Sequence, residues 1–154
     1  MRYIVLFILL SVTQEVLSEG APDEFFAQIV DVTSDGEVSV EITNTSTEKQ
    51  WLHKAMRCND AGYATTQLFE VLQGLELVEY AWVEESDANF FSRDNYIELA
   101  PQDKVKFSCK LAVMYSMKQN RSYTVRYRAM NPKFFNKREK ILVETQIERV
   151  DYQK

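Results

Sequence analysis

The sequence is poor in the residues that several classes of functional site need. Its 154 residues include only two cysteines and one histidine, His53. A zinc site built on imidazole needs more than one histidine, and the sequence contains no HExxH motif. Two cysteines 51 positions apart also exclude a C-x-x-C redox pair and a cysteine-only metal site. We therefore expect no metal and no cofactor, and we expect His53 to be an ordinary strand residue.

An excess of positive charge is also missing. The chain has 18 Lys and Arg against 23 Asp and Glu, a formal net charge of −5. A mildly acidic protein without a concentrated basic patch binds nucleic acid and anionic membranes poorly. We expect no nucleic-acid partner.

Patterns typical of catalysis are absent as well. There is no G-x-S-x-G elbow for a serine nucleophile, and a cysteine–histidine pair would require a free thiol. Three acids, Glu84, Glu85 and Asp87, crowd one loop, but no second acidic cluster is tied to them and the EF-hand pattern is missing. The sequence therefore predicts a protein that is not an enzyme.

The first residues have the features of a secretory leader. Arg2 precedes a short apolar run, and Val16 and Ser18 stand at positions −3 and −1 of a cleavage site before Glu19. The alternative is a membrane anchor, but a spanning helix needs roughly 20 apolar residues and this run is about half as long. We predict a signal peptide at residues 1–18, one domain at residues 19–154, a secreted extracellular protein and no membrane span.

Cys58 and Cys109 are predicted to form a disulfide, because a single pair of cysteines behind a signal peptide usually does. The alternative is two buried free thiols. Cys109 falls on the apolar side of its strand, so we expect the bond to be buried.

Two N-x-[ST] sequons offer candidate N-glycosylation sites, Asn44 and Asn120. Both lie in polar stretches between apolar-periodic segments, where a glycan could be tolerated. Their use depends on whether the host glycosylates secreted proteins.

Alternation of apolar and polar residues dominates the rest of the chain. In "EVSVEIT", Val38, Val40 and Ile42 share one face, and "KVKFSCKLAV" and "KILVETQIERV" repeat the pattern, the latter with Ile147 on the apolar side. This period of two marks strands that are buried on one side only. Less regular strands are expected at residues 25–33, 50–54, 68–73, 75–84 and 96–99, with one or two helical turns within 111–120. The fold class predicted is all-β, an antiparallel sandwich of seven to eight strands with at most one short helix.

The segment "NRSYTVRYRAM" places two arginines on one side of a strand. Tyr123, Val125 and Tyr127 would point to the core, and Arg126 and Arg128 to the outer face. If the last strand returns beside this one, acidic or amide side chains come within reach across the ladder: Glu144, Gln146 and Glu148. We interpret the arginines as part of a charge-matched sheet face.

Two polar loops each carry a pair of phenylalanines. "ESDANFFSRDNY" holds Phe90 and Phe91, and "NPKFFNKREK" holds Phe134 and Phe135. Loops carry function on sandwich scaffolds, and aromatic side chains dominate protein interfaces. We take these four residues as candidate binding residues. The alternative is that they fold back over the open ends of the sandwich.

Several motifs together resemble a known family. They are Asn44-Thr45-Ser46 at the end of a strand, a turn at Leu99–Pro101, and the "Y-x-V-x-Y" strand formed by Tyr123, Val125 and Tyr127. This order resembles the immunoglobulin-like domain at the N-terminus of deuterolysin-type and peptidyl-lysine metalloendopeptidases, and it is similar to the intracellular proteinase-inhibitor fold of bacteria. The glycine usual before that last strand is replaced by "NRS", and no zinc-binding helix pattern accompanies it. The resemblance implies an immunoglobulin-like fold and a role beside a protease, and it transfers no catalytic residue.

The sequence thus predicts a secreted, non-catalytic, protein-binding β-sandwich, with a protease-directed binder or inhibitor as the specific hypothesis. Two alternatives stay open. One is a carrier of a small apolar ligand held between the sheets, which the aromatic content would allow. The other is a structural extracellular component.

Overall fold

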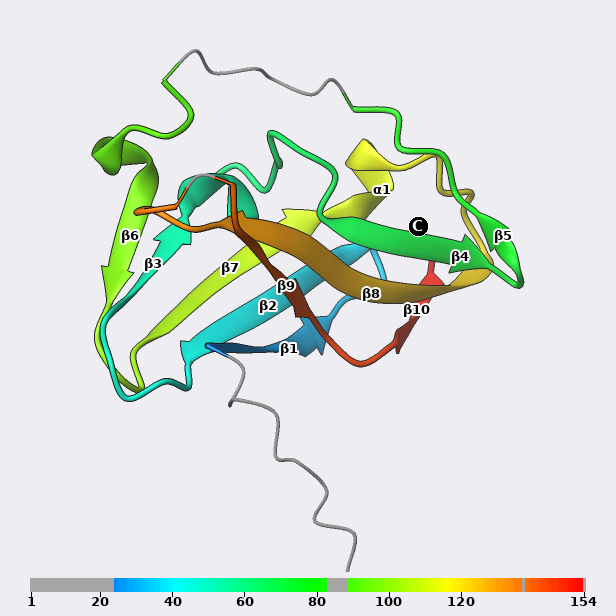
Figure 1. Ribbon diagram of the computed structural model, residues 1–154. Coiled ribbons are helices and arrows are strands. Elements are labelled where there is room, and N and C mark those ends of the chain that lie inside the picture. Colours follow the sequence, from blue (N-terminus) through cyan, green and yellow to red (C-terminus); the bar gives the residue numbers. More distant parts are fainter. Residues whose placement is uncertain (1–23, 83–88, 137, 154) are drawn as a thin grey trace, which may run out of the picture.

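The computed structural model describes residues 24–82, 89–136 and 138–153, which form an all-β chain with one short helix (Figure 1). The helix α1 (Leu111–Met114) lies inside the predicted helical stretch, and η1 (Lys54–Met56) and η2 (Arg93–Asn95) are single 3-10 turns. The strands are β1 (Phe25–Val32), β2 (Glu37–Asn44), β3 (Gln50–His53), β4 (Phe69–Gln73), β5 (Glu76–Leu77), β6 (Tyr96–Leu99), β7 (Lys104–Lys110), β8 (Arg121–Pro132), β9 (Lys140–Glu144) and β10 (Glu148–Tyr152). The described residues therefore hold ten strands, and the prediction of seven to eight was too low.

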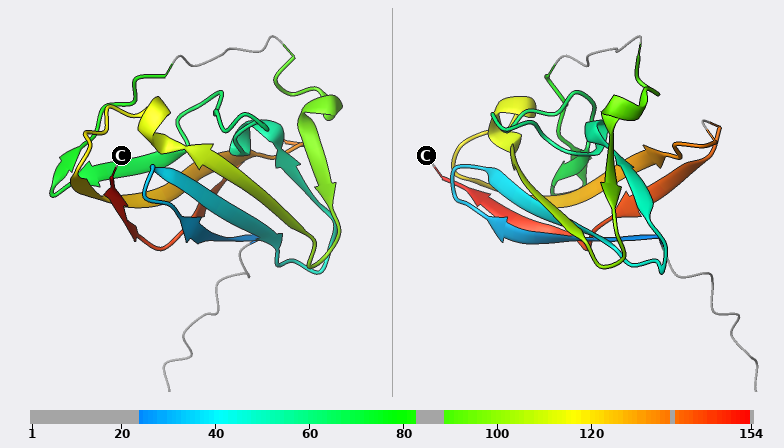
Figure 2. Two further views of the ribbon diagram at one scale, coloured as in Figure 1. Left: turned by 180° about the vertical axis from the view of Figure 1, so that it is seen from behind. Right: turned by 90° about the vertical axis from the view of Figure 1, so that its left-hand side faces the viewer.

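The strands form three antiparallel sheets. One has the order β1-β2-β7, a second has the order β10-β8-β4-β5 with β9 also paired to β8, and the third is the pair β3-β6 (Figures 1 and 2). The third sheet and the β4–β5 hairpin lie at opposite ends of the molecule. No described helix is long and apolar enough to cross a membrane.

Side chains from the two larger sheets build a single core. The predicted alternation holds in β2, where Val38, Val40 and Ile42 are fully buried. It also holds in β8, and the Tyr127 ring packs against Phe107 of β7 with 6.0 Å between ring centroids. The hydroxyl of Tyr127 donates to the carbonyl of Met56 at 2.7 Å, and burial raises the pKa of this phenol. Tyr127 therefore ties the centre of β8 to the segment that follows β3.

The two arginines of β8 lie on the outer face, as predicted. Nη2 of Arg126 donates to both carboxylate oxygens of Glu70, at 3.0 and 3.1 Å, and Nε of Arg128 lies 3.5 Å from Glu144. Glu70 stands opposite Arg126 on β4 and was not foreseen. Such half-exposed cross-strand pairs stabilise a sheet by about 0.2–1 kcal/mol each. The arginines are thus balanced by neighbouring carboxylates.

The return segment after β8 contains one residue more than the strand it pairs with. Glu144 lies opposite Arg128 and Glu148 lies opposite Val125, so three residues on one side face two on the other. One extra residue exchanges the faces of everything that follows. Val150 and Tyr152 are consequently buried, whereas Ile147 is 55% exposed.

This register shift corrects two expectations. Ile147 was placed on the apolar face together with Val143, and it is exposed instead. Glu148 was expected beside the arginines, but it shares the inward face with Val150 by alternation. Gln146 falls in the break between β9 and β10 and belongs to neither strand. Of the three predicted partners, only Glu144 contacts the arginines.

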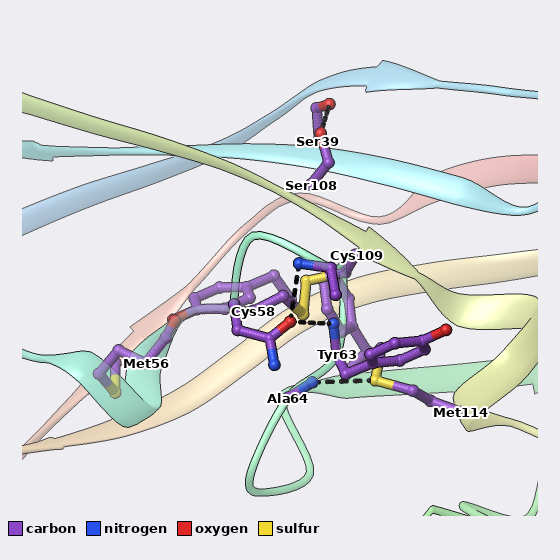
Figure 3. Close-up of a disulfide and its surroundings, with 12 residues drawn as sticks. Ser39, Met56, Cys58, Tyr63, Ala64, Ser108, Cys109 and Met114 are labelled. Carbon is purple, nitrogen blue, oxygen red and sulfur yellow. Dashed lines mark hydrogen bonds between the residues drawn. A yellow bond between two sulfur atoms is a disulfide. The ribbon is translucent and has the colours of Figure 1, made fainter.

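Cys58 and Cys109 form the predicted disulfide, and both are buried (Figure 3). Cys109 comes from β7, and Cys58 from the loop after η1. The same loop bonds to β7 through the Lys110 N–H and the carbonyl of Gly62, at 3.0 Å. Gly62 has φ +87°, and a Cβ there would lie 3.0 Å from the Lys110 side chain, so the close approach favours glycine. The loop that follows β3 and η1 is therefore fastened to β7 of the first sheet.

Some expectations concern residues outside the described part of the chain. The predicted signal peptide at residues 1–18 and the acidic cluster of Glu84, Glu85 and Asp87 are among them. A buried disulfide is compatible with an extracellular location.

The register shift between β9 and β10 makes a testable prediction. Val150→Ala should lower the free energy of unfolding by about 1.5–3 kcal/mol, because it removes fully buried methyl groups. Ile147→Ala should change it by no more than about 0.5 kcal/mol, because Ile147 lies outside the core. Urea unfolding of both variants measures the difference. The opposite ranking would mean that the apolar alternation runs through the break without a shift.

Candidate functional site

The structure brings the two phenylalanine pairs to the same end of the molecule. The third sheet, β3-β6, joins them. His53 of β3 stacks on Phe90, Tyr96 of β6 packs against Phe134, and these two residues are paired across the sheet. We call this set the aromatic end, and it consists of Trp51, His53, Phe90, Phe91, Tyr96, Phe134 and Phe135. Three of these residues, Trp51, His53 and Tyr96, were not among the predicted binding residues.

On one side of the aromatic end, His53 holds the first phenylalanine loop. Its ring stacks on Phe90 with centroids 4.0 Å apart, and Phe91 packs edge-on against Phe90 at 5.1 Å. The Nδ1 atom of His53 accepts from the Ala55 N–H at 3.0 Å, which assigns the ring proton to Nε2. Nε2 then donates to the carbonyl of Phe90 at 2.6 Å. These bonds make His53 a structural link between β3 and the loop.

On the other side, Phe134 and Phe135 have different environments. Phe134 packs on Trp51, with centroids 4.9 Å apart, and edge-on against Tyr96 at 5.0 Å. Phe135 contacts the edges of Phe134 and Trp51 but is 85% exposed. Of the two alternatives for this loop, folding back therefore applies to Phe134 and projection into solvent to Phe135.

Asn131 positions the Phe134–Phe135 loop relative to the third sheet. It is buried near the end of β8, where its Oδ1 accepts from the His53 N–H at 2.9 Å and its Nδ2 donates to the Trp51 carbonyl at 3.0 Å. Beyond Pro132, the chain turns back with a bond from the Lys133 N–H to the Glu139 carbonyl at 3.0 Å. The dipeptide Asn131-Pro132 signalled that β8 ends here, but nothing local indicated that the asparagine side chain would bond to β3.

The aromatic end carries a basic rim. The segment "KFFNKREK" has four cationic residues and one anionic residue in a chain of net charge −5. The Arg93 guanidinium lies over the Trp51 ring, 5.4 Å from its centroid. Lys133 binds Glu24 at 3.1 Å and Glu139 at 3.4 Å, and the bond to Glu24 contributes most to raising the pKa of its ammonium group. Arg138 and Lys140 are exposed and make no ion pair with a described residue.

A pocket of about 360 Å³ opens beside His53 and Phe90, on the side of the disulfide. Its lining also includes Arg57, Asn59 and Tyr63. Among the described residues, no group of three or more His, Cys, Asp or Glu side chains converges closely enough to hold a metal ion. The arrangement can present aromatic surface and positive charge.

The sequon at Asn44 lies in the interior of the fold. The Asn44 side chain is fully buried, and its Nδ2 donates to the carbonyls of Glu48 and Leu99 at 2.8 and 3.0 Å. Its Oδ1 accepts from the N–H and the hydroxyl of Ser46. A glycan on Nδ2 would replace one of these hydrogens and would need space that the core does not have. Asn44 therefore joins the ends of β2 and β6 structurally.

Asn120 is the accessible sequon. It is exposed, has φ +55°, and stands immediately before β8. Asparagine tolerates this left-handed conformation better than most residues.

No protein-family model matches the chain, and no curated protein matches its sequence. The resemblance to the immunoglobulin-like domain of metalloendopeptidases therefore rests on the quoted motifs alone.

The unequal burial of the two loop phenylalanines predicts unequal effects on stability. Phe134→Ala should lower the free energy of unfolding by about 2 kcal/mol or more, because it removes packing on Trp51 and Tyr96. Phe135→Ala should change it by no more than about 0.5 kcal/mol. Chemical denaturation of the two single variants tests this. Equal losses would show that both rings pack against the body of the protein.

The two sequons should differ in use. When the protein is secreted from a host that glycosylates asparagine, the folded, disulfide-bonded product should carry its glycan at Asn120 alone. The exchange Asn120→Gln should remove the glycan without unfolding the protein, since the side chain is exposed. Peptide mass spectrometry locates the glycan, and modified Asn44 in folded protein would contradict the burial described above.

Proposed function

We propose that this protein is a secreted, non-catalytic binding protein whose partner is another protein that docks on the aromatic end. One observation carries the proposal: Phe135 is 85% exposed, its ring contacts Phe134 and Trp51, and Phe134 in turn packs on Tyr96. A large apolar ring held on a packed base loses little conformational freedom on binding. Aromatic residues of this kind supply much of the energy in protein interfaces.

The charge around Phe135 indicates the chemistry of the partner. Arg93 lies over the Trp51 ring that Phe135 contacts, Arg138 and Lys140 are exposed in the segment that follows Phe135, and only Lys133 is offset by ion pairs among the described residues. The complementary surface has an apolar pocket for Phe135 with acidic residues at its border. Exposed charges at a rim act mainly on the rate of association, so binding should weaken as salt is added.

We also propose that the two larger sheets form an immunoglobulin-like sandwich. The orders β1-β2-β7 and β4-β8-β10 support this, because they match two sheets of such a domain in which the first, second and fifth strands oppose the third, sixth and seventh. The disulfide between β7 and a loop departs from the usual link between the two sheets. Within this interpretation, a protease is the partner class to test first, because the sequence resemblance implies a role beside one.

A carrier of small apolar ligands finds no supporting observation between these sheets. Tyr123, Tyr127 and Phe107 fill the region that such a ligand would occupy. Lipid that co-purifies with the protein and raises its melting temperature would favour the carrier over the binding protein.

The proposal is tested with three matched proteins: the wild type, Phe135→Ala and Leu75→Ala. Leu75 is 99% exposed on the β4–β5 hairpin at the far end of the molecule, so its exchange removes another exposed apolar side chain away from the aromatic end (Figure 1). A partner is first identified by affinity capture from the native extracellular fluid, and dissociation constants are then measured with purified components. Phe135→Ala should weaken binding by about 2 kcal/mol or more, roughly 30-fold, and Leu75→Ala by less than twofold. Equal affinity of all three proteins would exclude Phe135 as an anchor.

A further inference from the structure

The first sheet has an open edge along β1. Within the described residues β1 pairs only with β2, and β2 lies between β1 and β7. In an antiparallel pair, successive residues turn their main-chain N–H and C=O groups alternately toward the partner and away from it. At the open edge of β1, every second residue therefore directs its main-chain N–H and C=O groups away from β2.

Two hydrogen bonds determine which residues of β1 face outward. The Thr45 N–H donates to the Glu24 carbonyl at 3.1 Å, so by alternation the main chains of Phe26 and Gln28 also face β2. The Asn44 N–H donates to the Asp103 carbonyl at 3.0 Å, on the other side of β2, which agrees with this assignment. The main-chain groups of Phe25, Ala27 and Ile29 consequently point away from the sheet.

The open edge faces a groove rather than a packed neighbour. A cavity of about 340 Å³ is lined by residues 26–29 of β1 and, on the opposite side, by Glu144, Thr145, Gln146 and Glu148. The second set contains the break where β9 and β10 exchange register, and β1 lies beside β9 at one end of the groove (Figures 1 and 2). The break that carries the extra residue thus forms the wall of the groove opposite β1.

The groove carries one carboxylate that is not paired with a cation of the described residues. Its ionisable lining residues are Glu144 and Glu148. Glu144 is balanced by Arg128 at 3.5 Å, but Glu148 is exposed and makes no ion pair with a described residue. By alternation Glu148 shares the inward face with Val150, so its carboxylate lies on the side of the sheet that faces the groove.

We propose that this groove accepts a short extended segment of another protein, which adds to β1 as a strand and carries basic side chains toward Glu148. Unpaired main-chain donors and acceptors in a row are complementary to an extended backbone, and strand addition to an open edge is a common way to bind peptides. The β-bulge after Ile29 limits the usable edge to residues 25–29. Glu148 adds a preference for a basic side chain on the side of the segment that faces it.

The probe is a synthetic seven-residue peptide of alternating valine and lysine with capped ends, compared with a peptide in which glutamate replaces lysine. The lysine peptide should bind and slow amide hydrogen exchange of Ala27 and Ile29 at least tenfold. It should leave exchange of Leu77, on the β5 edge, unchanged. Absence of this protection, or equal binding of the glutamate peptide, would overturn the proposal. Protection that grows with protein concentration in the absence of peptide would assign the edge to a second copy of the chain and would also overturn it.

Two variants separate the main-chain and charge contributions. Ile29→Pro removes an outward N–H and should weaken peptide binding at least tenfold, whereas Leu77→Pro removes an N–H that likewise points away from its partner strand and should change binding less than twofold. Glu148→Gln keeps an exposed polar side chain and should weaken the lysine peptide at least threefold. If Ile29→Pro fails to fold, the hydrogen-exchange measurement on the wild type tests strand addition to β1. Unchanged affinity of Glu148→Gln for the lysine peptide would overturn the preference for basic segments.

Discussion

Main-chain pairing of β8 on both of its edges is the constraint on which most of this structure depends. This strand of 12 residues bonds to β4 on one side and to β9 and β10 on the other. Its inward side chains fill the core, its outward arginines bind carboxylates from both neighbours, and Asn131 near its end holds β3. A central strand with partners on both edges cannot slide, because a shift of one residue would place arginine in the core.

The single extra residue between β9 and β10 shows how a local irregularity shapes the surface. It allows both strands to bury apolar side chains against β8 although their sequence alternates in opposite phase. Thr145 stabilises the break, since its N–H donates to the Tyr127 carbonyl and its hydroxyl accepts from the Tyr127 N–H. The same break faces the outer side of β1, where that strand has no hydrogen-bonded neighbour among the described residues.

The aromatic end is assembled from segments that are far apart in the chain. Trp51 and His53 come from β3, Phe90 from the loop before η2, Tyr96 from β6, and Phe134 from the loop after β8. Ring contacts and the β3–β6 pairing join these segments, and Asn131 supplies two bonds that fix β3 against β8. The residues that pack against Phe135 are therefore held in place by β8, the strand that also fills the core.

The sequence by itself determined the strand alternation, the disulfide and the outward position of Arg126 and Arg128, because each follows from neighbouring residues or from counting cysteines. The tertiary structure alone decided three things: the register shift that exposes Ile147, the burial of Asn44, and the meeting of the two phenylalanine loops. Local patterns report which side of a strand is apolar. They contain no information on which distant strand will pair with it or in what register, since that choice depends on how all the sheets fill one core.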